Sequence, residues 1–215
     1  MSFISKIISL LYPRRCPYCR NIIEENEYAC EKCRNDFPKD DILTGAYGHR
    51  CISPFPYKDN YKKALLTFKF RDKEQYAPLL SYPMYECIKR QFGDIDFDII
   101  TCVPMHKKDF RKKGYNHSKL LAKEIAKFLG VSYLDTLLKT KQTPKQHKLP
   151  LSKRKTNLKG AFKLADKEIV KGKTILLVDD VITTGATLSF CSKELLKGNP
   201  KNIYCVTLTN ATVKY

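Results

Sequence analysis

The second half of the chain alternates short apolar runs with helical periodicity. Phe97, Ile99, Ile100 and Val103 predict a strand that ends at Pro104, and a buried strand is expected from Ile175 to Val178. Helices are predicted between and after these strands, with one-sided apolar sets Leu121, Ile125, Phe128 and Leu188, Cys191, Leu195. The segment IYCVTLT then predicts a last strand. Strand, helix and strand in this order indicate right-handed crossovers and a largely parallel sheet, an α/β fold.

Weaker patterns fill the rest of the chain. Ala64, Leu65 and Phe68 predict a helix, Pro78 stands near the start of another that runs toward Phe92, and 131–134 fits a short strand. Residues 45–60 fit extended segments or a linker, and we expect Lys69 and Arg71 to face water rather than a site. Residues 139–160 lack an apolar period and are rich in Lys, Gln and Thr, as in a functional or mobile loop.

Composition indicates a globular protein with an unusual charge. The 215 residues are 43% hydrophobic and 29% charged, and 40 Lys and Arg against 22 Asp and Glu give a formal net charge of +18. This excess favours polyanionic partners: nucleic acid first, then phosphorylated small molecules, then anionic membrane surfaces. A solvated lysine-rich surface is the alternative.

The cysteines indicate a metal site and a reducing compartment. Nine cysteines is an odd number and no cleavable leader precedes them, which argues against a secreted disulfide protein. Two Cys-x-x-Cys turns, Cys16 with Cys19 and Cys30 with Cys33, supply the four thiolates of a structural zinc site. Two redox dithiols or unpaired buried cysteines are the alternative. Cys51, Cys87, Cys102, Cys191 and Cys205 lie among apolar neighbours and are expected in the core.

The first residues carry a short amphipathic pattern. Phe3, Ile4, Ile7, Ile8 and Leu11 recur at helical spacing, but Lys6 and Pro13 limit the apolar run to a length that cannot span a bilayer. We therefore expect no transmembrane segment, a cytoplasmic protein and at most a peripheral contact with the inner face of the membrane.

The segment VDDVITTGAT, residues 178 to 187, carries the candidate chemistry. At the carboxyl end of a parallel strand, the helix that follows offers free N–H groups to an anion. Gly185 permits close approach of a phosphate, and the hydroxyls of Thr183, Thr184 and Thr187 add donors. Asp179 and Asp180 suit ribose hydroxyls or a hydrated magnesium ion. A Walker loop is excluded because no Gly-Lys-Ser/Thr is present.

This segment resembles the phosphoribosyl pyrophosphate (PRPP) motif of type I phosphoribosyltransferases. The four-cysteine knuckle, the Lys113-Gly114-Tyr115-Asn116 run and the diacid strand together resemble the ComF family of competence proteins, over nearly the whole chain. Other residues that match in order are Thr143, Gln146, Leu151, Arg154 and Asn157. The sequence has Lys113 where the family has Arg and His117 where it has Gln. Glutamine amidophosphoribosyltransferases share the later half of the pattern.

The resemblance implies a type I phosphoribosyltransferase fold and a set of roles. Asp179 and Asp180 would contact the ribose hydroxyls, and Arg154 would assist catalysis by stabilising charge. Met105 to Lys113 would form the pyrophosphate loop, and 139–160 a loop that closes over PRPP and Mg²⁺. The implied ligand-binding residues are Met105, His106, Lys107, Lys108, Arg111, Lys113, Gln146, Val181, Ile182, Thr183, Thr184, Gly185, Ala186 and Thr187.

Three functions are compatible with these features. The first is a competence protein that handles incoming single-stranded DNA and works with DNA-uptake proteins, with Tyr18, Tyr57, Tyr61 and Tyr115 as candidate stacking residues. The second is an active phosphoribosyltransferase with an unidentified base or amine as acceptor. The third is a zinc-dependent protein-interaction module of the transformation machinery. The expected organisation is a zinc knuckle at 1–45, a connecting hood segment at 46–94 and the phosphoribosyltransferase-like domain at 95–215.

Overall fold

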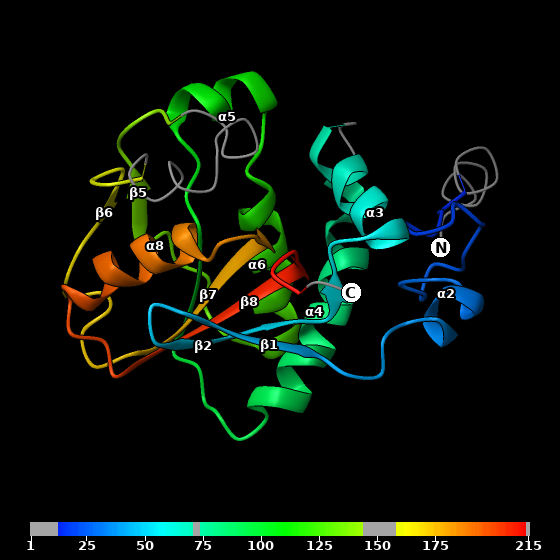
Figure 1. The fold of residues 1–215 in the computed structure, drawn as a ribbon, viewed down its shortest axis with the longest axis horizontal. Helices are drawn as coiled ribbons and strands as arrows, with labels where there is room; N and C mark the ends of the chain where they lie inside the picture. Colours follow the sequence, from blue (N-terminus) through cyan, green and yellow to red (C-terminus); the bar gives the residue numbers. More distant parts are fainter. Residues whose placement is uncertain (1–12, 71–73, 144–157, 214–215) are drawn as a thin grey trace, which may run out of the picture.

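A central sheet organises the chain in the computed structural model, which describes residues 13–70, 74–143 and 158–213 (Figure 1). The strand order is β1-β2-β8-β7-β4, with β3 beside β8. Among the described strands of this sheet, only β1 and β2 pair antiparallel, so the expectation of a largely parallel sheet is confirmed. The strands are β1 (Ile42–Ala46), β2 (His49–Ser53), β3 (Phe55–Pro56), β4 (Ile99–Cys102), β7 (Thr174–Ile182) and β8 (Asn202–Asn210).

Helices cover both faces of this sheet. Leu176 and Val178 of β7 pack with the helices α4 (Ala77–Phe92) and α6 (His117–Leu129), whereas Ile175 and Leu177 pack with α8 (Ala186–Leu196). All four side chains are fully buried, as expected for a strand at the centre of a doubly covered sheet. The predicted set Leu188, Cys191 and Leu195 is the buried face of α8.

The segment before α4 adds a further layer beside the first face. Helix α3 (Asp59–Phe70) buries the predicted Ala64, Leu65 and Phe68, and the 3₁₀ turn η1 (Glu74–Tyr76) leads into α4. The short helix α2 (Glu31–Asn35) belongs to the cysteine-rich N-terminal part, which packs in the same hydrophobic core. The region expected to be extended or a linker forms the β1/β2 hairpin and joins the sheet through β2.

Three expectations about local structure are corrected. The β7 strand does not turn after Val178 but continues to Ile182, because β8 remains its partner as far as Asn210. The basic stretch after β4 is a helix, α5 (Lys107–Lys113), rather than a loop, with His106 as its N-cap and left-handed Gly114 as its C-cap. The strand expected at 131–134 is reduced to one bridge between Tyr133 and Ile100.

The loop predicted at 139–160 connects two short strands that pair with each other. Strands β5 (Leu137–Lys139) and β6 (Phe162–Leu164) pair antiparallel below α5 and beside α8 (Figure 1). Periodicity missed this hairpin because each strand is only three residues long. Residues 144–157, with Gln146 and Arg154, and the N-terminal pattern from Phe3 to Leu11 lie outside the described residues, as does Arg71.

Candidate functional site

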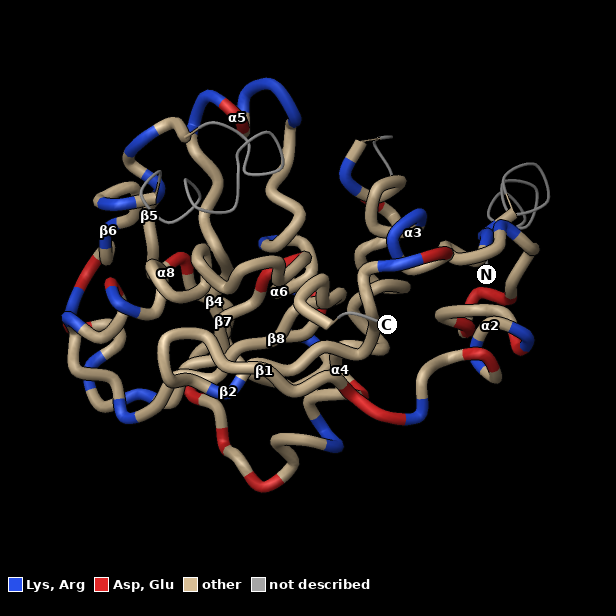
Figure 2. The backbone as a smooth tube through the Cα atoms, in the orientation of Figure 1, with Lys and Arg blue, Asp and Glu red and all other residues tan. Residues whose placement is uncertain are grey.

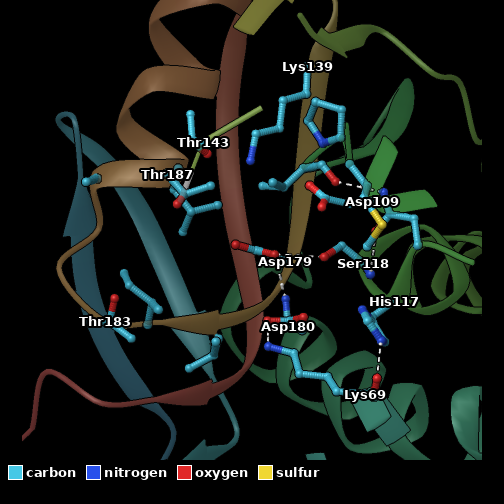
Figure 3. Close-up of a pocket in the computed structure, with 18 of the residues that line it drawn as sticks. Lys69, Asp109, His117, Ser118, Lys139, Thr143, Asp179, Asp180, Thr183 and Thr187 are labelled. Carbon is cyan, nitrogen blue, oxygen red and sulfur yellow. Dashed lines mark hydrogen bonds and ion pairs between the residues drawn. The ribbon is translucent and has the colours of Figure 1, made fainter. Parts of the chain in front are cut away.

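A cavity of about 670 Å³ opens at the carboxyl ends of β4 and β7 (Figure 3). Pairing of β4 with β7 ends at Val178, so the last four residues of β7 extend beyond their neighbour on that side. Asp179 and Asp180 stand at this step, and neighbouring strand residues point to opposite faces of the sheet. The cavity lining accordingly includes Ser118 of α6 and Thr187 of α8, one from each covering layer.

Asp179 is held from the α6 side. Its Oδ1 accepts hydrogen bonds from Ser118 Oγ at 2.7 Å and from the Asp180 backbone N at 2.9 Å. The side chain is buried, and this burial, followed by the nearby Asp180 carboxylate, raises the pKa of Asp179 to about 7. The Ser118 hydrogen bond acts in the opposite direction. An acid kept at this pKa is sensitive to any cation or hydroxyl that enters the cavity.

Asp180 is held by Lys69 of α3, which packs on the same side of the sheet as α6. Lys69 Nζ lies 2.6 Å from Asp180 Oδ1, with 18% and 11% of the two side chains exposed. The expectation that Lys69 faces water is therefore wrong. The sequence signal was ambiguous because a lysine at the end of a helix is usually solvated. Here the end of α3 lies against the sheet, and the ammonium is the counterion nearest to the diacid.

Two side chains of the 115–117 segment fix the end of α3. The Tyr115 hydroxyl donates to the carbonyl O of Phe68 at 2.7 Å, and His117 Nε2–H donates to that of Lys69 at 3.0 Å. Carbonyls in the last turn of a helix have no partner within the helix, so these bonds anchor the turn that carries Lys69. Burial lowers the pKa of His117 to about 4, so the ring is neutral at pH 7. His117 thus positions Lys69 and carries no charge toward an anion.

The start of α6 is set by Asn116. Its Oδ1 accepts from the Ser118 backbone N at 3.1 Å as an N-cap, and its Nδ2 donates to Val103 O at 3.0 Å. These two bonds join the end of β4 to the start of α6 and aim Ser118 at Asp179. Sequence reasoning missed Ser118, although an N-cap Asn two residues before it was a usable signal.

The turn after β7 forms the other wall of the cavity. Gly185 has φ 71°, a left-handed conformation, and is the N-cap of α8, so the first turn of that helix begins at the cavity wall. Thr183 and Thr187 line the cavity, whereas Thr184 Oγ1 accepts from the Ala186 backbone N at 3.4 Å and lies outside the lining. Lys139 of β5 enters from above, and burial lowers its pKa (Figure 3).

The cavity gathers only part of the predicted ligand-binding set. Those that line it are Met105, Lys113, Asp179, Asp180, Val181, Ile182, Thr183, Gly185, Ala186 and Thr187. His106, Lys107, Lys108, Arg111 and Thr184 are not among the lining residues. His106 Nδ1 instead accepts from the Lys108 backbone N at 3.2 Å. Lys69, His117, Ser118 and Lys139 are lining residues that the sequence did not single out as ligand contacts.

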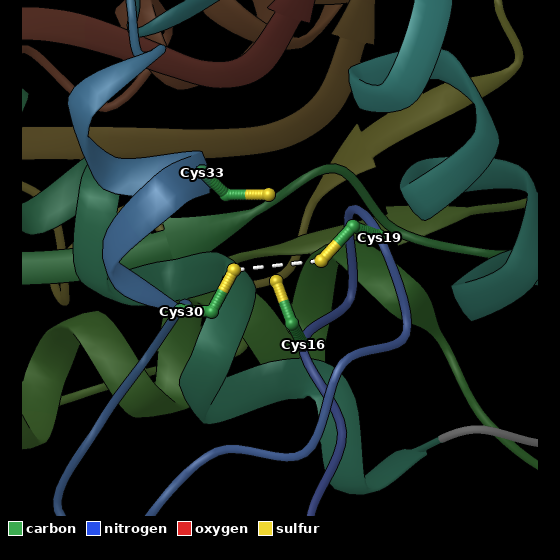
Figure 4. A group of neighbouring side chains, drawn as sticks. All are labelled: Cys16, Cys19, Cys30 and Cys33. Atoms are coloured by element: carbon green, nitrogen blue, oxygen red, sulfur yellow. Dashed lines mark hydrogen bonds between the residues drawn. The ribbon is translucent and has the colours of Figure 1, made fainter.

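The four knuckle cysteines form a separate cluster (Figure 4). Their Sγ atoms lie within 4.8 Å of one another, and Cys19 and Cys30 approach to 3.4 Å. Four thiolates around zinc lie about 3.8 Å apart, from a Zn–S length of about 2.3 Å, so this cluster fits a structural zinc ion. Arg20, beside the knuckle, donates to Tyr76 OH at 2.6 Å and to Thr67 Oγ1 at 2.9 Å. The zinc ion would therefore stabilise the surface on which α3 and η1 rest.

Most of the tyrosines considered for base stacking are buried or already packed against other aromatic rings. Tyr18 and Tyr115 are buried, at 5% and 6% exposure, and Tyr61 stacks on Phe55 at 4.3 Å. Their assignment as exposed stacking residues is wrong, because Tyr18 and Tyr61 pack with Phe55 and with each other, whereas Tyr115 packs against Phe68 and His117. Tyr57 is half-buried and lines the cavity. The five other cysteines are buried, as predicted.

Comparisons with known proteins match the two parts of the chain separately. A phosphoribosyl transferase domain matches residues 115–215, and a double zinc ribbon domain matches residues 7–65. Among the described helices, none has the length and apolar character needed to cross a bilayer.

Relatives with known names cover most of the chain. Competence protein F of Haemophilus influenzae is 29% identical over 84% of this chain and 79% of its own. DNA utilization protein YhgH of Salmonella typhimurium is 27% identical over 90% of this chain and 84% of its own. Competence protein ComFC of Bacillus subtilis is 28% identical over 73% of this chain and 62% of its own.

Among solved structures, the chain aligns in part with glutamine phosphoribosylpyrophosphate amidotransferase from B. subtilis, complexed with ADP and GMP. It aligns with 66% of this chain at 14% identity and a TM-score of 0.45. The chain spans 30% of the length of that enzyme.

Proposed function

Since this chain is a homologue of the ComF competence proteins and carries a phosphoribosyl transferase domain behind a double zinc ribbon, we propose that it is a competence protein whose cavity binds PRPP with Mg²⁺. The observation that carries the proposal is the buried pair Asp179 and Asp180, which faces the first turn of α8 across one cavity. A pair of carboxylates accepts hydroxyl donors, and a helix start binds an anion. A sugar phosphate offers both.

Each part of the cavity has a task in this proposal. The carboxylates of Asp179 and Asp180 accept from the ribose hydroxyls, in competition with the bonds from Ser118 and Lys69. The turn with Thr183, Gly185 and Thr187 holds the 5-phosphate through backbone N–H groups and hydroxyls. Met105 and Lys113, at the end of β4 and α5, are proposed to face the pyrophosphate. Asp179 and Asp180 could also hold a hydrated Mg²⁺ through their oxygen donors, and the ion would supply positive charge to neutralise the departing pyrophosphate.

Binding of PRPP tests this assignment. We expect calorimetry to show binding of PRPP in the presence of Mg²⁺, and the double variant Asp179→Asn, Asp180→Asn to bind at least about tenfold more weakly, a loss of about 1.4 kcal/mol. Asp98→Asn is a matched control, because Asp98 is an exposed acid just before β4, at the opposite end of that strand from the cavity. Absence of binding by the unaltered protein, or equal binding by the double variant, would remove the proposal.

The cellular role proposed is handling of incoming single-stranded DNA in the cytoplasm during natural transformation, alongside DNA-uptake proteins. The names of the relatives, with competence and DNA utilization, support this role. Transformation frequency in cells whose sole copy carries the double Asp change measures the contribution of the cavity. Normal frequency would separate the DNA role from the sugar-phosphate site.

Turnover is a second candidate function, favoured by the shape of the cavity. Beyond the diacid, the lining continues over Tyr57, Leu66 and Phe70, an apolar and aromatic wall that suits a planar base. An active phosphoribosyltransferase would release pyrophosphate from PRPP only when its acceptor is present. Screening bases and amines for acceptor-dependent pyrophosphate release tests turnover, and the double Asp variant is the blank.

A further inference from the structure

Helix α5 carries an exposed cluster of cations that the cavity does not use. Lys107, Lys108, Arg111 and Lys112 are exposed and absent from the cavity lining (Figure 2). Within the part of the chain that the structure describes, none of these four side chains forms an ion pair with an acid. Much of the positive charge near the cavity mouth is therefore free to meet a partner from solution.

This arrangement costs the helix stability. Lys107 and Arg111 are four residues apart, as are Lys108 and Lys112, so two like-charge pairs repel on a helix of seven residues. Asp109 supplies the one acid in this helix. A polyanion that binds along α5 would relieve the repulsion, which gives the charge complementarity of this surface an energetic basis.

An aromatic ring stands among these cations. Phe110 is 46% exposed although it lies in a helix whose neighbours are all polar or charged. An exposed ring beside cations is the combination that binds single strands, because bases stack on the ring while phosphates meet the charges. A duplex keeps its bases paired inside and offers this ring no free face.

The basic surface continues from α5 to the β5/β6 hairpin. Lys139 is close enough to Asp109 of α5 for that carboxylate to act on the pKa of Lys139. Lys141 and Lys159, both exposed, lie just beyond the hairpin strands, with Lys141 Nζ 3.3 Å from where a Cβ on Gly160 would stand. Figure 2 shows Lys and Arg segments around the β5 and β6 labels as well as along α5.

We propose that single-stranded DNA binds along the exposed face of α5, with its phosphates on the four cations of α5 and a base stacked on Phe110. The strand would continue toward Lys141 and Lys159 at the rim of the cavity. The choice of DNA as the partner rests on the proposed function, whereas the surface is assigned from charge, exposure and the ring. Helix α5, about 10 Å long, would contact a few nucleotides.

Anisotropy of a labelled oligo(dT) strand tests the surface. The variant Lys107→Gln, Lys108→Gln, Arg111→Gln, Lys112→Gln is expected to bind at least about tenfold more weakly at low salt, and its slope of log Kobs against log salt to fall by about 2 to 3. The control variant Lys167→Gln, Lys171→Gln, Lys197→Gln, Lys201→Gln removes the same charge from exposed sites near the amino ends of β7 and β8 and should keep the slope. Circular dichroism confirms folding of both.

A second pair of variants tests the ring. Phe110→Leu keeps an apolar side chain but cannot stack, and we expect about five- to tenfold weaker binding of oligo(dT) with an unchanged salt slope. Phe110→Tyr keeps the aromatic face and should bind as the unaltered protein does. Because the ring is half exposed, neither change threatens the fold.

Three results would overturn the proposal. In the first, the α5 variant and its control lose oligo(dT) binding equally. In the second, the protein binds duplex DNA more tightly than single strands. In the third, the α5 variant no longer binds anionic vesicles but still binds oligo(dT). The last would assign the surface to a membrane. Failure of the sugar-phosphate site is a different result, since it appears as absence of PRPP binding by the unaltered protein and leaves the DNA measurements unaffected.

Discussion

The free energy of unfolding should report the buried charge of Asp179 directly. The folded protein raises the pKa of this group from 3.8 to about 7, mainly through burial. Between these two values the folded state binds a proton that the unfolded state has lost, so the free energy of unfolding falls as pH rises from about 4 to about 7. The penalty is complete above about pH 7 and absent below about pH 4.

The magnitude follows from the same two values. A rise from 3.8 to about 7 corresponds to about 4 kcal/mol at pH 8. Asp179→Asn removes the charge but keeps an Oδ1 that can accept from Ser118 and the Asp180 N–H. The new amide N–H₂ must still be desolvated, which costs about 2 kcal/mol. We therefore expect the free energy of unfolding of Asp179→Asn to be about 2 kcal/mol higher than that of the wild type at pH 8.

Urea denaturation of both proteins between pH 5 and pH 8 measures this difference. The advantage of Asp179→Asn should disappear by pH 5, where the folded wild type keeps Asp179 protonated, and other titrating groups cancel because both proteins contain them. Asp98→Asn is a control of opposite sign, since its bonds from Thr174 N and Lys173 lower the pKa of Asp98. A variant less stable than wild type at pH 8, or a difference that does not change with pH, would refute the reasoning.

Three further changes have defined outcomes. Lys69→Met should lower the free energy of unfolding by about 2 to 3 kcal/mol at pH 8, because Asp180 loses a buried counterion. The control Lys63→Met, on the exposed face of α3, should change this free energy by less than about 0.5 kcal/mol in the same urea titration. Gly185→Ala should cost about 1 kcal/mol through its φ of 71°, since no atom obstructs the added Cβ, and a larger loss in the melting curve would show that this turn is tighter than the structure has it. Removal of zinc by a chelator, or the change Cys33→Ser, should lower the melting temperature and weaken the packing of η1. The control Cys51→Ala should leave the zinc content, measured by mass spectrometry, unchanged. A zinc content in Cys33→Ser equal to that of the wild type would exclude the four-thiolate site.

Local sequence determined the elements whose signal lies within a few residues. The apolar run Ile175 to Val178 indicated a doubly buried strand, the spacing of Leu188, Cys191 and Leu195 indicated α8, and two Cys-x-x-Cys turns indicated the zinc cluster. Each of these patterns depends on one element or one turn. The order of strands and helices was enough to predict the parallel sheet and the edge at which the site lies.

Tertiary structure decided every contact between distant segments. Lys69 reaches Asp180 across 111 positions, and Ser118 reaches Asp179 across 61, because the sheet brings α3 and the start of α6 to the same strand end. The pattern of α3 contains no information on what its last turn meets, so water was the expected neighbour of Lys69. The cations of α5 show the opposite outcome. From the sequence they were expected to contact a phosphate, but Lys107, Lys108 and Arg111 do not line the cavity. A helix of seven residues beside a cavity presents only part of its circumference to that cavity, and the fold decides which part.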